Sequence, residues 1–397
     1  MQNVHSLVWV SSIATMALLG CGNSVLGSGD GPLDPPFPLG TGGSGGAPLG
    51  TGGPGGAPLG TGGPGGAPIG GCDGALCHGA CVDTSSDASN CGACGHDCLG
   101  GACVAGACQP VVLAADAGRY PYSLAVAGDS VFWATLGDDL DSGPTGGIYR
   151  VGKAGGPTAT VLAGLRGPDM LAANATNLYF RAQPGLVEGV PQSGGAATML
   201  ASGAKSALAV SSSTLFYADQ AAGTVAGLPL AGGTPVVLAS GLDAPSALAV
   251  SGANVFCGDL EGVKRIPIGP GSGAVQLLSP KTPNGPLVVD ATSVYWTSDV
   301  AILSVPQGGG VVRKIASSAS GTATFAVDDQ FVYWVIPSTP EQPDEAIARA
   351  PIAGGPTVTL VPALAVDIQA IAVDATSVYW TSFGPNGSNA VVMRLAK

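Results

Sequence analysis

Short apolar runs recur along the C-terminal three-quarters of the chain, each followed by a polar turn and a second run rich in Val and aromatic residues. The clearest pair is LVVDATSVYWTSD at 287–299 and IAVDATSVYWTS at 371–382. Looser copies begin at Leu124, Leu171, Leu208, Leu248 and Phe325, so seven copies follow one another about 40 residues apart. A period of this length with Gly-rich turns is typical of propeller blades or another repeat array.

Each repeat contains four apolar patches, which the fifth copy shows most clearly. They predict strands at 287–289, 293–297, 301–306 and 311–316, with a Gly-rich hairpin turn at 308–310. Strands that pack on both faces carry apolar runs and not strict alternation, so the pattern favours blades stacked on one another. Small residues recur in the first strands, as expected near a crowded axis: Ala125, Ala172, Ala209, Ala249, Ala326 and Ala372.

The seventh copy ends after its third strand at 391–395, whereas residues 110–115 (PVVLAA) resemble the fourth strands of other copies. We therefore expect 110–115 to pair with the last strand and close a ring, which removes two exposed sheet edges. The predicted fold class is all-β, with a seven-bladed propeller of three-plus-one strand closure over residues 109–397.

Residues 1–20 contain an apolar run that is too short to span a bilayer comfortably and predicts an export signal. The sequence Leu18-Leu19-Gly20-Cys21 resembles the lipobox of bacterial lipoproteins, which implies cleavage before Cys21 and lipidation of that residue. The n-region lacks Lys and Arg, and Leu19 is bulkier than usual, so a plain secretory signal is the alternative. Gly22 stands where the inner-membrane retention signal has Asp. The expected location is the outer membrane or cell surface of a Gram-negative bacterium, through the lipid anchor, or otherwise the medium.

Residues 21–71 are expected to form a flexible tether behind the lipidated Cys21. Three Gly-rich decapeptides, each beginning Pro-Leu-Gly, follow one another at 38–67. Regular Pro prevents a helix, and the Gly spacing excludes a collagen repeat. Such a coil spans roughly 40 Å root-mean-square, which would carry a domain clear of lipid headgroups.

Residues 72–108 contain eight cysteines and almost no large apolar residue, so a core of their own is not expected. The cysteines are Cys72, Cys77, Cys81, Cys91, Cys94, Cys98, Cys103 and Cys108. In an exported chain this even number predicts disulfides, whose pairing the sequence leaves open. Zinc is the alternative, because Cys91-Gly-Ala-Cys94 has ligand spacing and two His are nearby. The segment CVDTSSDASNCGACGHDC resembles a short Cys-rich module of myxobacterial secreted proteins.

The motifs Tyr295-Trp296-Thr297-Ser298-Asp299 and Tyr379-Trp380-Thr381-Ser382 resemble the YWTD motif of low-density-lipoprotein-receptor propellers. The third-strand residues Arg150, Arg265, Arg349 and Arg394 fit the wider pattern. The resemblance implies a propeller that binds protein or glycan on a face or rim, without catalysis. The chain departs from that family in having seven predicted blades where six are known, and in lacking the Asp in most copies.

Carboxylates gather in the loops after second strands and before first strands, which share one face of a propeller. The candidates are Asp138, Asp139, Asp169, Asp219, Asp243, Asp259, Asp299 and Asp367. Asp219, Asp259 and Asp299 recur every 40 residues, so equivalent places in successive blades are expected. Such a ring could hold Ca²⁺, which takes oxygen ligands. The alternative is that these are solvated loop residues, diluted by Arg119, Arg166 and Lys205. No other cofactor is expected.

Charge and composition narrow the function. The net charge is −12 and no basic patch stands out, so nucleic acid is not an expected partner. All three His lie at or before His96, which excludes Ser-His-Asp and Cys-His sites from the large domain. Cys257 and the tryptophans of the second strands are expected in the core. The expected function is a monomeric surface binding or scaffold protein for a protein or glycan partner. The alternatives are a calcium-dependent lactonase or esterase at the propeller axis and a purely structural envelope component.

Overall fold

The chain folds almost entirely into β-strands. The computed structural model describes residues 74–137, 143–203, 205–269, 274–317, 324–338, 344–364, 366–384 and 387–397, and no α-helix occurs among them. Within these ranges no helix has the length and apolar character to cross a membrane. The predicted signal segment and tether, with Cys21 and Cys72, lie outside the described residues, as do Asp138 and Asp139.

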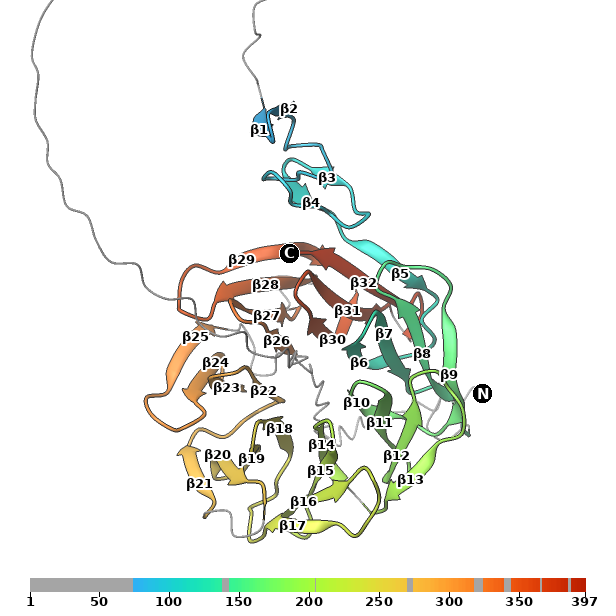
Figure 1. Cartoon of the computed structure of the whole chain (residues 1–397), viewed down its shortest axis with the longest axis vertical. Helices are drawn as coiled ribbons and strands as arrows, with labels where there is room; N and C mark the ends of the chain where they lie inside the picture. The colour runs from blue at the N-terminus through green and yellow to red at the C-terminus, as the bar shows by residue number, and fades with distance from the viewer. Residues whose placement is uncertain are drawn as a thin grey trace, which may run out of the picture.

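Seven four-stranded antiparallel sheets, numbered here as blades 1 to 7 in chain order, form a ring (Figure 1). Blade 1 contains β6 (Pro121–Ala127), β7 (Ser130–Thr135), β8 (Gly146–Gly152) and β9 (Ala159–Leu165). Blade 2 contains β10 (Asp169–Ala173), β11 (Asn177–Ala182), β12 (Leu186–Pro191) and β13 (Thr198–Ala201). Blade 3 contains β14 (Lys205–Val210), β15 (Thr214–Asp219), β16 (Thr224–Pro229) and β17 (Val236–Ala239). Blade 4 contains β18 (Ala247–Ser251), β19 (Asn254–Asp259), β20 (Gly262–Pro267) and β21 (Gln276–Ser279).

The remaining blades complete the ring. Blade 5 contains β22 (Leu287–Val289), β23 (Ser293–Ser298), β24 (Ala301–Pro306) and β25 (Arg313–Ser317). Blade 6 contains β26 (Phe325–Val327), β27 (Phe331–Ile336), β28 (Glu345–Pro351) and β29 (Val358–Leu364). Blade 7 contains β30 (Asp367–Val373), β31 (Ser377–Phe383), β32 (Val391–Ala396) and β5 (Val111–Ala115).

The predicted closure is confirmed. β5, from the beginning of the domain, is the outer strand of blade 7 and pairs antiparallel with the last strand, β32. Val111 lies opposite Arg394, and Ala115 lies opposite Val391. The first strands of all neighbouring blades contact one another around the axis, including β30 of blade 7 and β6 of blade 1. The ring therefore has no gap between its first and last blades.

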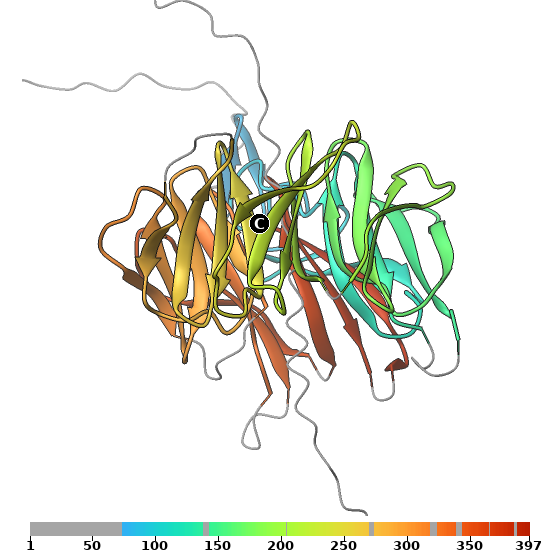
Figure 2. The same ribbon diagram turned by 90° about the horizontal axis from the view of Figure 1, so that it is seen from below.

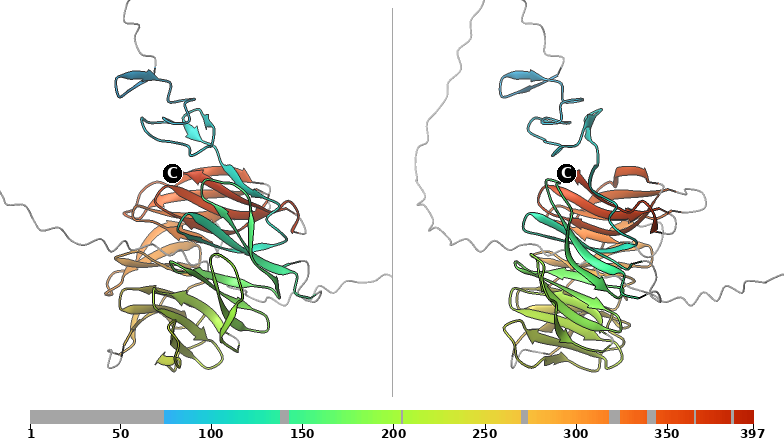
Figure 3. Two further views of the ribbon diagram at one scale, coloured as in Figure 1. Left: turned by 45° about the vertical axis from the view of Figure 1, so that its right-hand side comes forward. Right: turned by 90° about the vertical axis from the view of Figure 1, so that its right-hand side faces the viewer.

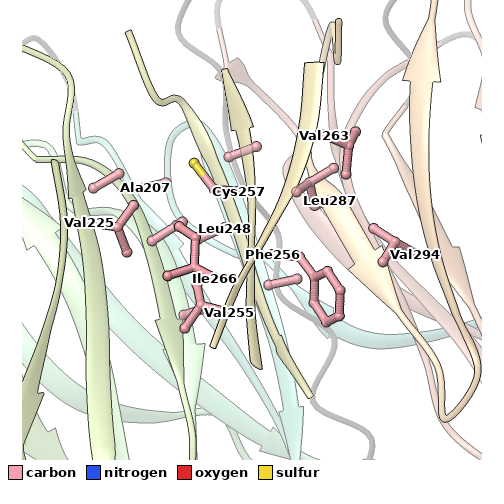
Figure 4. Packing of buried hydrophobic residues seen from close by; sticks show 14 of the residues in the cluster. Ala207, Val225, Leu248, Val255, Phe256, Cys257, Val263, Ile266, Leu287 and Val294 are labelled. Carbon is pink, nitrogen blue, oxygen red and sulfur yellow. The ribbon is translucent and has the colours of Figure 1, made fainter. Parts of the chain in front are cut away.

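The core lies between the blades, because each sheet is covered on both faces. The tryptophans predicted as core are confirmed there, with Trp133 and Trp296 at 0% exposure. Figure 4 shows how one strand serves two interfaces: Cys257 of β19 points towards Ala207 and Val225 of blade 3, whereas the adjacent Phe256 points towards blade 5. This explains why the second strands are apolar at consecutive positions.

The ring has two faces, which Figure 2 shows edge-on. The hairpin face carries the turns between first and second strands and between third and fourth strands. The predicted Gly hairpins lie there, and Gly309 and Gly310 have φ of +89° and +141°, which strongly favours glycine. The long-loop face carries the loops after second strands and those that lead from one blade to the next.

The Cys-rich segment forms a small module beside blade 7, at the edge of the ring (Figure 3). It contains two short hairpins, β1 (Ala75–Cys77) with β2 (Ala80–Val82), and β3 (Cys103–Val104) with β4 (Ala107–Cys108). Its buried residues Cys91, Cys98, Cys103 and Cys108 belong to the same apolar cluster as residues of blades 6 and 7. The module is thus packed on the propeller, a placement that the sequence did not predict.

Candidate functional site

The predicted carboxylates that the structure describes all lie on the long-loop face. Asp219 and Asp259 are the last residues of β15 and β19. Asp299 is not equivalent to them. Strand pairing shows which residues are equivalent: the first residue of each copy lies opposite Tyr217 in blade 3, Cys257 in blade 4 and Trp296 in blade 5. Asp219 and Asp259 each come two residues after this position, and the residue two after Trp296 is Ser298. The expectation of three equivalent carboxylates was wrong because the fifth copy follows after 39 residues and not 40.

Three of these carboxylates form ion pairs with cations of their own blades. Asp169, at the start of β10, accepts two hydrogen bonds from the Arg181 guanidinium, one of them Nε to Oδ1 at 2.8 Å. The Lys205 Nζ lies 2.8 Å from Asp219 Oδ2. Lys264 pairs with the fully buried Asp259 and with Glu261. Blades 2, 3 and 4 therefore neutralise part of the negative charge that the sequence places on this face.

Burial sets the protonation behaviour of these pairs. Desolvation raises the pKa of Asp169, and the hydrogen bond and charge of Arg181 only partly oppose it. Asp219 is more exposed, and the hydrogen bond from Lys205 lowers its pKa, helped by the backbone N–H of Ala222. Both carboxylates already have a cationic partner, so neither is a ready ligand for a second cation.

The candidate carboxylates that the structure describes do not converge. Within the described ranges, no group of three carboxylates brings its oxygens as close together as a metal ion requires. Asp243, Asp299 and Asp367 are exposed. At the axis, the cavity between Tyr122, Pro286, Thr324 and Gln369 has a volume of only about 10 Å³, which is room for at most one water molecule. The described carboxylates therefore do not assemble the calcium ring that the sequence suggested.

Exposed apolar side chains stand among these acids. Leu260 follows Asp259 and is 62% exposed, and Val300 follows Asp299 and is 53% exposed. Both backbone polar groups of Leu260 are hydrogen-bonded. The Leu260 N–H donates to Asp243 O at 2.9 Å, and the Leu260 carbonyl accepts from the Thr282 hydroxyl. Blades 4 and 5 therefore each present an exposed apolar side chain on this face, and the backbone of Leu260 is held in place by hydrogen bonds.

A hollow of about 690 Å³, widely open to solvent, lies where the ring closes, between the loop from β5 to β6 and the loop from β31 to β32. Its lining residues are Asp116, Gly118, Arg119, Gly387, Ser388, Asn389 and Ala390. Sequence reasoning missed this hollow, except that Arg119 was placed on the same face. No motif marks it, because two segments more than 250 residues apart form it only after closure.

A second set of residues missed from the sequence lies on the hairpin face. Asp290, in the turn after β22, accepts hydrogen bonds from the N–H of Ser293 and from the Tyr295 hydroxyl, both at 2.7 Å. Asp328 with Tyr333 and Asp374 with Tyr379 repeat this arrangement. Burial raises the pKa of all three Tyr hydroxyls, and their Asp acceptors act in the same direction. The sequence signal is an Asp five residues before a Tyr.

Lysines connect two of these aspartates across blade boundaries. Lys153, in the turn between β8 and β9, lies 2.7 Å from Asp374 of blade 7. Lys397, at the end of β32, pairs with Asp328 of blade 6. The Lys153 pair spans the junction of the first and last blades.

The predicted disulfides are present in the module. Cys77 pairs with Cys94, Cys91 with Cys103, and Cys98 with Cys108, and Cys81 is also disulfide-bonded. The zinc alternative required thiolates at Cys91 and Cys94, which instead belong to two different disulfides. The cluster of Cys91, Cys98 and Cys108 sulfurs is likewise oxidised and offers no thiolate ligand. Cys257 is a free thiol whose pKa burial raises to about 12, as expected of an inert core residue.

Comparison with known proteins supports the fold. No protein-family model matches the chain, and no curated protein matches it. A streptogramin B lyase structure matches with a TM-score of 0.55 at 9% identity, over 73% of this chain and 98% of that one. The AfRom2 CNH domain matches with a TM-score of 0.51 at 12% identity, over 72% and 99%. A nidogen/laminin complex matches with a TM-score of 0.41 at 18% identity, over 53% and 86%. These likenesses concern architecture alone.

Proposed function

We propose that this chain is a lipid-anchored cell-surface protein whose propeller binds a protein or glycan partner through its long-loop face. The observation that carries the proposal is the composition of that face. Its buried carboxylates are paired within their own blades, while Leu260 and Val300 are exposed beside the acidic residues Glu261 and Asp299. Exposed apolar side chains among charged residues are the composition that a recognition surface with an apolar centre and a polar rim requires.

The anchor, tether and module fit the same role. Lipidation at Cys21 would hold the chain at the outer membrane or cell surface, and the Gly-rich tether would give the propeller reach. Disulfides suit an exported protein. A calcium-dependent hydrolase would need carboxylates that converge on a metal ion, and none converge among the described residues. We therefore favour binding without catalysis.

The test compares two matched double variants on intact cells. Leu260→Asp with Val300→Asp changes the long-loop face. The rim control, Val311→Asp with Val358→Asp, places the same charges at the periphery of the ring, on a residue just before β25 and on the first residue of β29, which are 76% and 47% exposed in the native chain. Chemical cross-linking should give a discrete partner species with the native chain and with the rim control. We expect several-fold less of that species with the face variant, because desolvating an aspartate in an interface is costly.

The anchor is tested in the same cells. Cys21→Ser should abolish incorporation of a labelled fatty acid and move the chain from the detergent phase to the aqueous phase. Identical cross-linking by all variants would contradict the binding face, and unchanged lipid labelling of Cys21→Ser would contradict the anchor.

A further inference from the structure

On the long-loop face, each exposed apolar side chain of blades 4 and 5 lies next to an acidic residue. The Leu260 N–H donates to the carbonyl of Asp243 at 2.9 Å, which joins the backbones of these two exposed residues. Val300 directly follows the exposed Asp299 in the turn from β23 to β24. Two neighbouring blades therefore repeat one combination, an exposed aliphatic side chain with an exposed acidic residue beside it.

The protein does not neutralise these two acids itself. Neither Asp243 nor Asp299 forms an ion pair with a described residue, and the buried Lys264 already has two carboxylate partners. The exposed Lys281, in the loop that leads into blade 5, offsets only part of the charge, and the whole chain carries −12. A partner that brings cations is therefore attracted to this region, whereas a partner with exposed acids is repelled.

Among the described residues, the propeller exposes no aromatic side chain. Every Trp, Tyr and Phe of residues 109–397 lies in the described part of the chain, and each is buried or half-buried. Sugar rings pack their flat apolar faces on exposed aromatic rings, which this surface does not offer. Aliphatic side chains such as Leu260 and Val300 instead suit the aliphatic stems of long protein side chains. The composition of the face therefore favours a protein partner over a glycan.

We propose that the long-loop face of blades 4 and 5 binds a basic protein segment whose anchors are arginines. An arginine has the two parts that match this surface: a guanidinium that pairs with a carboxylate, and an aliphatic stem that packs on an apolar side chain. Arginine is also among the residues that contribute most to binding at protein interfaces. One arginine pairs with Asp243 beside Leu260, and a second pairs with Asp299 beside Val300. The inference rests on the proposed surface-binding function and narrows its partner to one class.

The test measures the affinity of a fluorescent peptide for the purified chain by anisotropy at low ionic strength. The probe is a short peptide that alternates Arg with Leu, and its control has Glu in place of every Arg. Asp243→Asn with Asp299→Asn removes the two acids, and Asn tolerates the φ of +52° at position 299. Asp129→Asn with Asp329→Asn is the matched control, because it removes the same charge from exposed turns of the hairpin face. Tryptophan fluorescence melting confirms that each variant is folded.

We expect the Arg peptide to bind the native chain and the Glu peptide not to bind. The long-loop variant should weaken binding by about fivefold or more and the hairpin-face control by less than about twofold, because both lose the same net charge from different faces. Equal weakening in the two variants would reveal unspecific attraction to an acidic protein and overturn the inference, as would absence of Arg-peptide binding.

The cross-linking experiment on cells separates this inference from the binding face itself. A cross-linked partner that requires Leu260 and Val300 but tolerates Asp243→Asn with Asp299→Asn would overturn the inference and leave the proposed binding face intact. Release of that partner by a glycosidase and not by a protease would overturn it too, by assigning the face to a glycan.

Discussion

At the scale of single residues, the hairpin face shows two positions that change together from blade to blade. Where the turn after the first strand has Asp or Asn, the residue five positions later is Tyr, as in Asp290 with Tyr295 and Asn174 with Tyr179. Where the turn has Ala or Ser, the partner is Phe: Ala127 with Phe132, Ser211 with Phe216, and Ser251 with Phe256. A buried hydroxyl needs a hydrogen-bond partner, and Phe removes that need.

This pairing predicts unequal effects of the same substitution. Tyr295→Phe leaves Asp290 Oδ2 without its hydroxyl donor, so we expect a loss of about 1–2 kcal/mol in the free energy of unfolding. Tyr333→Phe should cost less than half as much, because Asp328 Oδ2 keeps Lys397. Denaturant unfolding of both variants measures the difference. Equal losses in the free energy of unfolding would mean that the Tyr hydroxyl contributes through packing and not through its hydrogen bond to Asp.

Residue type predicted which side chains are buried, but it did not predict which charged side chains form ion pairs. Trp133, Trp296 and Cys257 are apolar residues within apolar runs, so their places in the core followed from the pattern. The cations that neutralise Asp169 and Asp219 lie 12 and 14 residues away on neighbouring strands. Strand register decides these pairs, and one shift of register would send each side chain to the other face of its sheet. The sequence could therefore place the carboxylates on one face without showing that they are paired.

At the scale of elements, the repeat predicted strands more accurately than loops. In blade 5 the bounds of β22 and β24 agree with the prediction, whereas β25 begins at Arg313 and not at Val311. The ladder between β24 and β25 contains a register shift between Ile302 and Leu303, and such irregularities interrupt the fourth strands of other blades as well. A bulge adds a residue without changing the apolar pattern, so the sequence does not reveal it.

The junction of blades 1 and 7 depends on a specific ion pair as well as on β5. Lys153→Met removes the partner of Asp374, and we expect the thermal midpoint at neutral pH to fall by about 2–4 °C, equivalent to about 1 kcal/mol in a domain of this size. Lys314→Met is the control, because Lys314 is exposed on the outer strand β25 of blade 5. A fall of equal size in the control would show that loss of any lysine charge, and not the junction, is responsible.

The pH dependence of this difference has a defined sign. Burial alone would raise the pKa of Asp374, but hydrogen bonds from Lys153, Thr376 and Tyr379 outweigh it and lower the pKa. A lowered folded-state pKa stabilises the fold above the unfolded value, near about 4 for Asp, and this stabilisation is lost as the pH falls through the folded value. The gap between Lys153→Met and the native chain should therefore close in acid. Melting curves across that range, with a gap that instead persists, would contradict the assignment.

At the scale of the whole molecule, the Cys-rich module is joined to the end of the ring. His96 Nδ1 and Nε2 lie 2.5 Å from the carbonyl oxygens of Cys91 and Lys397, so this one ring connects the module to the end of β32. Arg394 of β32 donates to the carbonyls of Leu99 in the module and Lys153 in blade 1. The sequence predicted disulfides but could not place the module, because these hydrogen bonds are to backbone carbonyls, which leave no mark on residue type.

This connection predicts that the redox state of the module affects the stability of the propeller. Four of the five tryptophans lie in blades 1, 5, 6 and 7 and none lies in the module, so tryptophan fluorescence follows the melting of the ring. Reductant should loosen the module and lower the ring's midpoint by several degrees, since disulfides of this loop length contribute about 2–4 kcal/mol each to local stability. His96→Asn should already lower the midpoint and shrink the further effect of reductant. His78→Asn, an exposed position in the same module, should leave both unchanged. An unaltered thermal midpoint of the ring in the native chain after reduction would contradict this prediction. The module would then not stabilise the propeller, and the closure would depend on β5 and Lys153.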